Sequence, residues 1–75
     1  MVPEIEEVYD LYIPINRRIG SVVNLLNKSL NEITDGLFIL DKKRSIYNHD
    51  TSVKYNINDI VRETDIRNGT ILVFI

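Results

Sequence analysis

The chain has 75 residues, of which 44% are hydrophobic and 27% are charged, with a formal net charge of −2 and no cysteine. This composition fits one small globular domain over residues 1–75, and it excludes a disulfide framework, a thiolate metal site and a cysteine nucleophile. The charge balance gives no general attraction to nucleic acid, no apolar run is long enough to span a membrane, and the acidic first residues are unlike a signal peptide. We therefore expect a cytoplasmic protein without membrane insertion.

The first predicted element is a strand over residues 8–13, where β-branched and aromatic residues dominate. Alternation divides the strand into two faces, and the face without Asp10 is the better core face. The core-facing residues are then Tyr9, Leu11 and Ile13. Pro14 ends the strand because it has no N–H to donate.

A helical pattern follows, with Asn16 as its expected N-cap and Asp35-Gly36 as its stop signal. Apolar residues recur at spacings of three and four, so they form one stripe on the helix. The stripe consists of Ile19, Val22, Val23, Leu26, Leu30 and Ile33. Polar residues such as Asn27 and Asn31 occupy the other side, and Leu25 falls off the stripe and is expected to be half-exposed.

Short elements are predicted after the helix. Residues 37–40 form an apolar run that is too brief for a helix and suits a strand. Residues 41–44 form a turn, and residues 45–47 a possible short return strand. Residues 48–56 are polar and irregular.

The last part of the chain contains a helical turn and a strand. Asn58 can cap a single turn that buries Ile60 and Val61, and Asn68-Gly69 is a turn signal. Residues 70–75 are the most β-prone segment, and a nearly continuous apolar strand of this kind is usually covered on both faces. One helix packed across a mixed sheet buries these surfaces, which predicts an α+β domain.

The order of these elements resembles ubiquitin from its second strand onward. Residues 9–14, Tyr-Asp-Leu-Tyr-Ile-Pro, are similar to the second-strand motif of the YukD/EsaB-like family, and residues 65–72, Asp-Ile-Arg-Asn-Gly-Thr-Ile-Leu, to its closing segment. That family comprises the ubiquitin-fold accessory proteins of type VII (WXG100) secretion systems. The resemblance covers residues 7–75 and implies a β-grasp (ubiquitin-like) fold and a role as a secretion accessory.

Two departures from the family pattern stand out. Only residues 1–3 precede the predicted turn at residues 4–7, so the first strand is expected to be short, missing or supplied from outside. Residues 47–56 also look longer than the family needs. The chain stops at Ile75 without the diglycine tail that conjugation requires. This disfavours the alternative function, a ubiquitin-like sulfur carrier or protein modifier.

Three groups of residues suggest chemistry, and each has a simpler interpretation. His49 and Asp50 could form an acid–base pair, but they also fit an exposed loop. Residues 42–44, Lys-Lys-Arg, could bind phosphate or an acidic tail, or form a solvated turn. The acids Glu4, Glu6 and Glu7 could bind a divalent cation or form a solubilising edge. We expect no enzyme activity, no cofactor and no metal.

The feature that points to a function is an apolar surface on the last strand. We expect alternate residues, Ile71 among them, to face the helix, which sends Leu72 and Phe74 outward beside Tyr12. An exposed patch of this kind usually marks a partner surface, although residues 47–56 or a second copy could cover it. Tyr12, Leu72 and Phe74 are therefore the predicted protein-binding residues.

These observations predict a non-catalytic adaptor or regulator whose partners are other proteins and not nucleic acid. A short or missing first strand would leave one edge of the last strand unpaired, and an unpaired edge is a template for association. We therefore also expect a homodimer, formed by exchange of the strand at residues 8–13 or by edge-to-edge pairing of the last strands.

Overall fold

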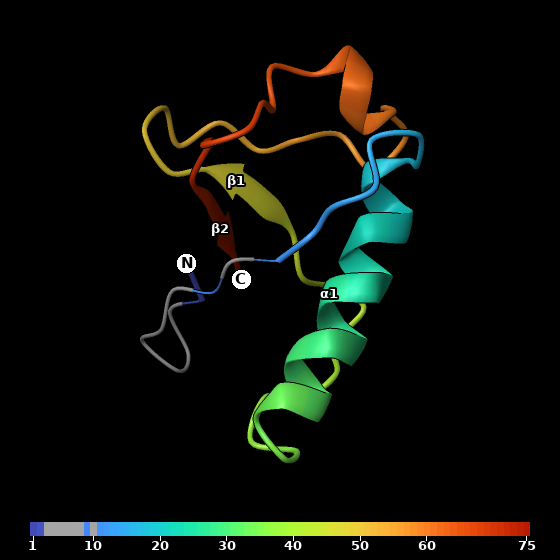
Figure 1. Cartoon of the computed structure of the whole chain (residues 1–75), viewed down its shortest axis with the longest axis vertical. Coiled ribbons are helices and arrows are strands. Elements are labelled where there is room, and N and C mark those ends of the chain that lie inside the picture. The colour runs from blue at the N-terminus through green and yellow to red at the C-terminus, as the bar shows by residue number, and fades with distance from the viewer. Residues whose placement is uncertain (3–8, 10) are drawn as a thin grey trace.

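The structure is a computed structural model that describes residues 1–2, 9 and 11–75. Its elements are the helix α1 (Ile19–Ile33), the strand β1 (Ile46–Asn48), the short 3-10 helix η2 (Val61–Glu63) and the strand β2 (Leu72–Phe74). The two strands pair antiparallel, with Ile46 opposite Phe74, and α1 lies to one side of them (Figure 1). The predicted α+β class is confirmed, as one helix and a two-stranded antiparallel sheet.

Helix α1 begins at Ile19, three residues after the predicted N-cap, Asn16. Its N-cap is Arg18, which makes no side-chain capping bond. Backbone carbonyls from a distant loop accept the free N–H groups at the start of the helix instead. The N–H of Ile19 donates to the Asp59 carbonyl at 2.8 Å, and the N–H of Gly20 donates to the Ile57 carbonyl at 2.9 Å. A Cβ at position 20 would lie only 3.3 Å from the Ile57 carbonyl, so glycine permits this close approach.

The apolar stripe of α1 forms the centre of the core, as predicted, except at its last residue. The stripe residues from Ile19 to Leu30 are buried, and Leu25 is partly exposed. Ile33 is exposed, because the lower end of α1 extends beyond the sheet (Figure 1). The helix ends just before Asp35 and Gly36, both of which have positive φ, as the stop signal predicted.

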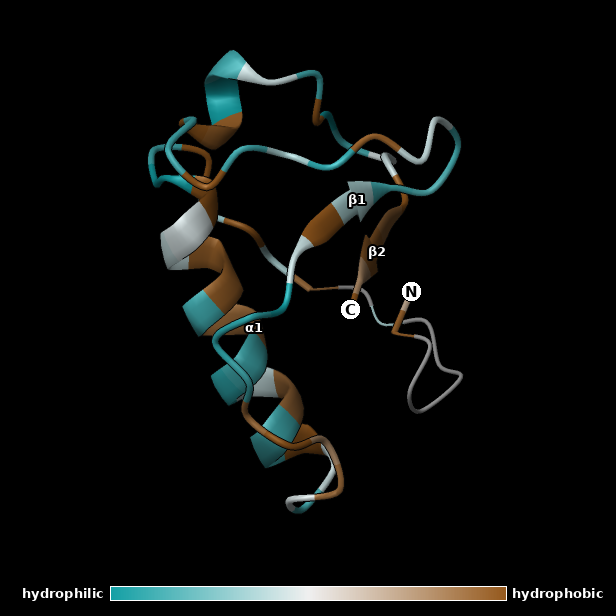
Figure 2. Ribbon diagram, turned by 180° about the vertical axis from the view of Figure 1, so that it is seen from behind, coloured by the Kyte–Doolittle hydropathy of each residue, from teal (hydrophilic) through white to brown (hydrophobic). Residues whose placement is uncertain are grey.

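The apolar run at residues 37–40 is not a strand. It runs back along α1, where the hydropathy colours show it as a brown segment (Figure 2). Only Phe38 is buried, and its flanking residues Leu37, Ile39 and Leu40 are exposed. Side chains of α1 hold the segment in place, because Asn31 donates to the Phe38 carbonyl at 2.9 Å and Asn27 to the Asp41 carbonyl at 2.9 Å.

Strand β1 confirms the predicted return strand with a shift of one residue. The following residues, predicted to be polar and irregular, contribute an unforeseen core residue, because Tyr55 is buried. Lys54 forms an isolated bridge with Tyr47, and the Tyr55 N–H donates to the Ile46 carbonyl at 2.9 Å. The chain therefore folds back along β1 before it reaches η2.

The predicted phase of the last strand is wrong. Phe74 is only 3% exposed, and Leu72 is partly buried against the core, whereas Ile71 is 47% exposed. The Phe74 ring stacks on Phe38 with centroids 5.9 Å apart, and an aromatic ring buries more apolar area than isoleucine does. The outer face of the sheet therefore carries Val73 and Ile75 in place of Leu72 and Phe74.

The prediction for the first strand falls partly outside the described residues, which exclude residues 3–8 and 10. Residues 11–14 are not in a strand, although Tyr9, Leu11 and Ile13 pack against the core, as predicted for that face. Met1, which we expected to leave β2 unpaired, pairs with it instead. Its amine donates to the Leu72 carbonyl, and its own carbonyl accepts from the Phe74 N–H at 3.0 Å.

Candidate protein-binding cleft

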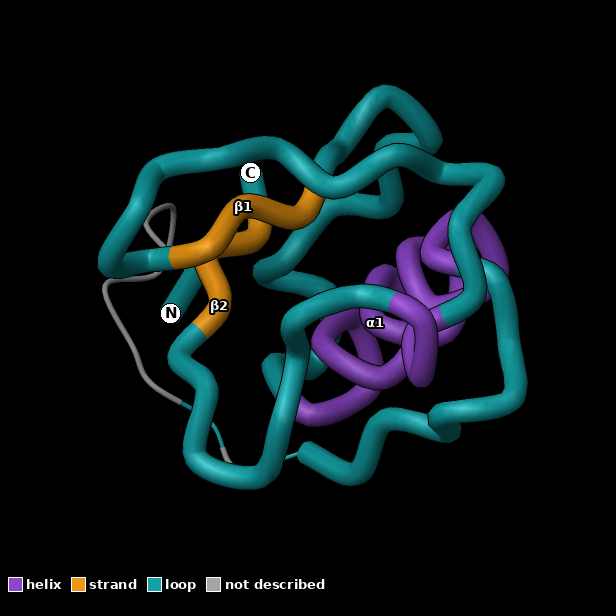
Figure 3. Tube along the Cα trace, turned by 90° about the horizontal axis from the view of Figure 1, so that it is seen from above, coloured by secondary structure: helices purple, strands orange, loops and turns teal. Residues whose placement is uncertain are grey.

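An apolar cleft of about 950 Å³ opens between the segment at residues 11–15 and the segment at residues 66–72. Figure 3 shows these two parts of the chain from above, beside α1 and the sheet. Core residues line the cleft from within, namely Leu26 and Leu30 of α1 together with Val61. The cleft thus reaches from the surface to the hydrophobic core, as ligand sites commonly do.

The first wall of the cleft is held by backbone hydrogen bonds to η2. The Arg62 N–H donates to the Ile15 carbonyl at 3.0 Å, and the Val61 N–H donates to the Arg17 carbonyl at 2.9 Å. An isolated bridge between Arg18 and Ile60 extends this pairing. These bonds fix the end of the wall where the chain enters α1.

The second wall is held by a turn and by a buried tyrosine. The Thr70 N–H donates to the Arg67 carbonyl at 2.9 Å, and Gly69 has the positive φ that this turn needs. The Tyr55 hydroxyl donates to Asp65 at 2.6 Å and accepts a bond from the Asn48 amide at 3.1 Å. Burial and then the hydrogen bond to Asp65 raise the pKa of Tyr55 above its ordinary value of 10.0.

All three predicted protein-binding residues line this cleft, but they differ in depth. Tyr12 is 86% exposed at the mouth, as predicted. Leu72 is partly buried, and Phe74 lies in the core, so the prediction that both point outward is wrong. The structure therefore brings the three residues to one cleft, and it places Phe74 where a substitution changes the core directly.

Among the described residues that line the cleft, two carry charged side chains, Arg62 and Arg67. Arg62 donates to the Asn16 side chain at 2.7 Å, and Arg67 donates to the Thr64 and Ile66 carbonyls at 2.7 and 2.8 Å. No carboxylate belongs to the described lining. The Met1 amine adds a further basic group, whose pKa is lowered by burial. The described lining is thus apolar inside and basic at its mouth.

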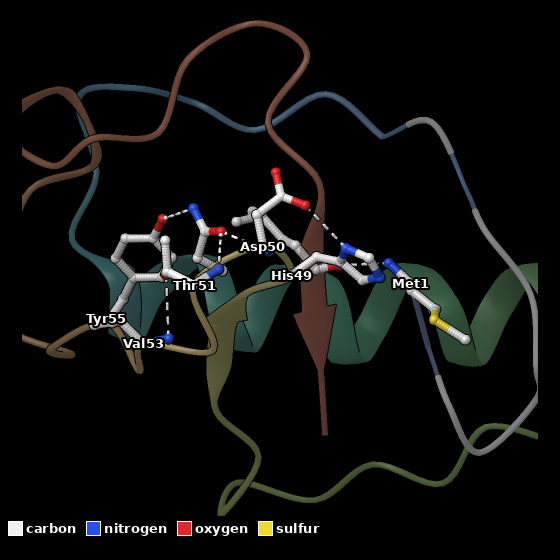
Figure 4. Close-up of polar contacts among 8 residues, drawn as sticks. Met1, His49, Asp50, Thr51, Val53 and Tyr55 are labelled. Atoms are coloured by element: carbon white, nitrogen blue, oxygen red, sulfur yellow. Dashed lines mark hydrogen bonds and ion pairs between the residues drawn. The ribbon is translucent and has the colours of Figure 1, made fainter.

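The other candidate sites of the sequence lie elsewhere. His49 contacts Asp50 at 3.2 Å on the surface, beside the turn that leads to Tyr55 (Figure 4). Lys42 and Lys43 are exposed in a turn, but the guanidinium of Arg44 lies 4.1 Å from the centre of the Phe38 ring, so it is a packing residue. Glu4, Glu6 and Glu7 lie outside the described residues.

Two further findings concern the residues that the structure describes. No group of three or more histidine, aspartate or glutamate side chains is placed to hold a metal ion. No helix of this part of the chain is long and apolar enough to cross a membrane.

Most residues of the cleft were not predicted from the sequence. Arg62, Arg67 and Ile71 were not predicted as site residues, because their convergence depends on the turn at residues 67–70 and on the phase of β2. The one available signal was the Asn68-Gly69 turn, which brings Arg67 and Ile71 close together in the chain. Nothing in the sequence placed Arg62 opposite them.

Comparison with known proteins adds no family to this picture. No protein-family model, no curated protein and no solved structure matches the chain.

Proposed function

We propose that this chain is a non-catalytic protein-binding adaptor with a β-grasp fold, and that it binds its partner through the cleft. The observation that carries the proposal is an apolar cleft of about 950 Å³ that reaches the core and has exposed Tyr12 at its mouth. An apolar surface of this kind, rimmed by polar groups, is typical of a protein-interaction site.

Three features support the β-grasp topology. Helix α1 packs against the sheet, and β2 pairs antiparallel with β1. On its other edge, β2 pairs with Met1. The Met1 amine donates to the Leu72 carbonyl, and the Met1 carbonyl accepts from the Phe74 N–H. These two bonds lie on either side of Val73, which is the hydrogen-bond pattern of parallel strands. A last strand between an antiparallel and a parallel neighbour is what the ubiquitin-like arrangement requires.

The proposal also includes the cellular system in which this adaptor acts. The resemblance of residues 9–14 and 65–72 to the YukD/EsaB-like family makes an accessory of a type VII-like secretion system the function to test, with the cytoplasm as its location. Fold resemblance alone does not determine a partner, so the cleft carries the binding claim and the resemblance only suggests where the partner belongs.

A capture experiment with matched variants tests the adaptor function. Ile71→Asp puts a charge at the exposed rim of the cleft, and Val53→Asp puts the same charge at an exposed position away from it. In an extract of the organism that encodes the chain, we expect wild type and Val53→Asp to retain the same partner and Ile71→Asp to lose it. Equal capture by both folded variants would show that the cleft is not the binding surface. A type VII component among the captured proteins would support the secretion setting.

A further inference from the structure

The edge of β2 beside the cleft has a backbone N–H group, that of Leu72, without a hydrogen-bond acceptor in the described part of the chain. The backbone groups of one strand residue point to the same edge, and the Leu72 carbonyl accepts from Met1, away from β1. The register of the two strands gives the same direction. Backbone hydrogen bonds join the pairs Ser45–Ile75 and His49–Ile71, and hydrogen-bonded and non-hydrogen-bonded pairs alternate in an antiparallel ladder, so the backbone groups of Leu72 point away from β1. Within the described part of the chain, the Leu72 N–H makes no hydrogen bond.

This edge and the apolar lining meet in the same cleft. Leu72 lines the cleft together with Leu11, Leu26 and Ile66, so a chain that accepted a bond from the Leu72 N–H would place its side chains against these residues. Side chains of a strand alternate between two faces. An extended peptide there therefore directs every second side chain toward the apolar lining and the intervening ones toward solvent.

Charge determines what the intervening side chains should be. Arg62 and Arg67 stand at the cleft, and neither forms an ion pair with any described carboxylate. Guanidinium groups favour carboxylates because their planar donors match the two oxygens. Acidic side chains on the outward face of the peptide would meet both arginines, whereas lysines there would be repelled.

From these three observations we propose that the occupant of the cleft is an extended segment of the partner protein in which apolar residues alternate with acidic ones. It adds to the edge of β2 by accepting a hydrogen bond from the Leu72 N–H, and it pairs its carboxylates with Arg62 and Arg67. This mode is strand addition, in which backbone bonds supply affinity and alternate side chains supply specificity. The inference rests on the proposed function and specifies the chemistry of the partner.

A titration with two synthetic peptides tests the inference. The first is a capped peptide in which valines alternate with glutamates, and the second has lysine in place of every glutamate. NMR of the whole chain with labelled nitrogen should show shifts at Leu72 and Ile71 with the first peptide, and slower hydrogen exchange of the Leu72 amide, by at least about tenfold. The lysine peptide should bind at least about tenfold more weakly, because it loses the charge complementarity.

Charge reversal on the protein gives the second arm. The variant Arg62→Glu/Arg67→Glu should prefer the lysine peptide to the glutamate peptide. If that variant loses its native spectrum, because Arg62 and Arg67 also make structural hydrogen bonds, the comparison of the two peptides on the wild-type chain decides alone.

Several results would overturn the inference. These are equal binding of the two peptides, shifts confined to another surface, no binding at all, or a Leu72 amide that becomes protected without peptide as the protein concentration rises. The last result would assign the cleft to a second copy of the chain. If the peptides fail but the Ile71→Asp variant still loses its captured partner, the adaptor function stands and only the strand-addition mode is wrong.

Discussion

Tyr55 joins two loops through a single hydroxyl group. That hydroxyl donates to Asp65 beside the cleft and accepts from Asn48 at the end of β1. The side-chain oxygen of Asn48 also accepts hydrogen bonds from the backbone N–H groups of Asp50 and Thr51, at 2.8 and 3.1 Å. The buried phenol of Tyr55 therefore helps to hold the second cleft wall, together with the turn at residues 67–70.

We expect Tyr55→Phe to lower the free energy of unfolding by about 1–3 kcal/mol at neutral pH, because it leaves the Asn48 amide without its acceptor in a buried site. The pKa of Tyr55 is raised in the folded state, so its stabilising contribution is complete below pH 10 and is lost as the pH rises through the folded-state pKa. Urea unfolding from pH 7 to pH 11 should show a steeper alkaline loss for wild type than for Tyr55→Phe. Parallel curves would contradict this assignment.

The phase of β2 gives a second prediction for single residues. Phe74→Ala should cost about 3–5 kcal/mol, because the ring is buried and stacks on Phe38. Ile71→Ala should cost less than about 1 kcal/mol, because this side chain is half-exposed. Chemical denaturation of both variants tests the phase directly. If Ile71→Ala proved the more damaging change, Ile71 and not Phe74 would face the helix.

Among the elements, the segment after α1 depends on polar side chains of the helix. Asn27 is only 4% exposed, although it lies on the side of the helix predicted to be polar. Its amide donates to the Asp41 carbonyl at 2.9 Å, and its side-chain oxygen accepts from the Asp41 N–H at 3.4 Å. Asn27 therefore acts as a clamp that holds an otherwise irregular segment along the helix.

We expect Asn27→Ala to destabilise the fold by about 1–3 kcal/mol, because the Asp41 N–H loses its acceptor and the Asp41 carbonyl keeps only the longer bond from the Arg44 N–H at 3.3 Å. Asn24→Ala is the matched control, since Asn24 is exposed on the same helix and alanine is the better helix former. Thermal unfolding followed by circular dichroism should show a lower midpoint for Asn27→Ala alone. A similar drop in both variants would point to the helix itself and not to the clamp.

The sequence predicted α1 well because its stripe repeats over many residues. The stripe from Ile19 to Leu30 is long enough to define one buried face without knowledge of the neighbours. The last strand is different, because residues 71–75 are all apolar and alternation alone does not decide which set faces inward. The decision comes from Phe38, which Phe74 meets across the core.

The sequence was less informative where backbone groups bond over long distances. The start of α1 follows from carbonyls at Ile57 and Asp59, which no local capping signal reveals. The segment at residues 37–40 looked like a strand because it is apolar, but its backbone forms hydrogen bonds with the side chains of Asn31, Thr34 and Arg44. The cleft itself was not predicted, because Tyr12, Leu72 and Phe74 were expected on an exposed sheet face. Its arginines were missed because Arg62 and Arg67 come from separate elements.

For the whole molecule, the free edge of β2 is shorter than the sequence suggested. Met1 bonds the Leu72 carbonyl and the Phe74 N–H, so the Leu72 N–H beside the cleft is the group of this edge that is left for association. The homodimer stays a prediction, which light scattering over a range of protein concentrations can decide. Such a dimer would use the cleft only if the Leu72 amide became protected together with the rise in mass.

The described residues form two separate apolar surfaces. Tyr12 stands at the mouth of the cleft, and Tyr47 lies on the outer face of the sheet with Val73 and Ile75. The sequence pattern predicted the outer face as the partner surface, whereas the binding site that we propose is the cleft, which Leu72 and Phe74 line. The two tyrosines offer a matched comparison between these surfaces.

The most direct measurement is therefore photo-crosslinking in the native cell from each tyrosine in turn. The photoreactive analogue p-benzoylphenylalanine replaces Tyr12 in one variant and Tyr47 in the other, so the two probes have the same chemistry. We expect a discrete crosslinked partner from position 12 and none from position 47. A partner crosslinked from position 47 and not from position 12 would contradict the claim that the cleft is the binding surface.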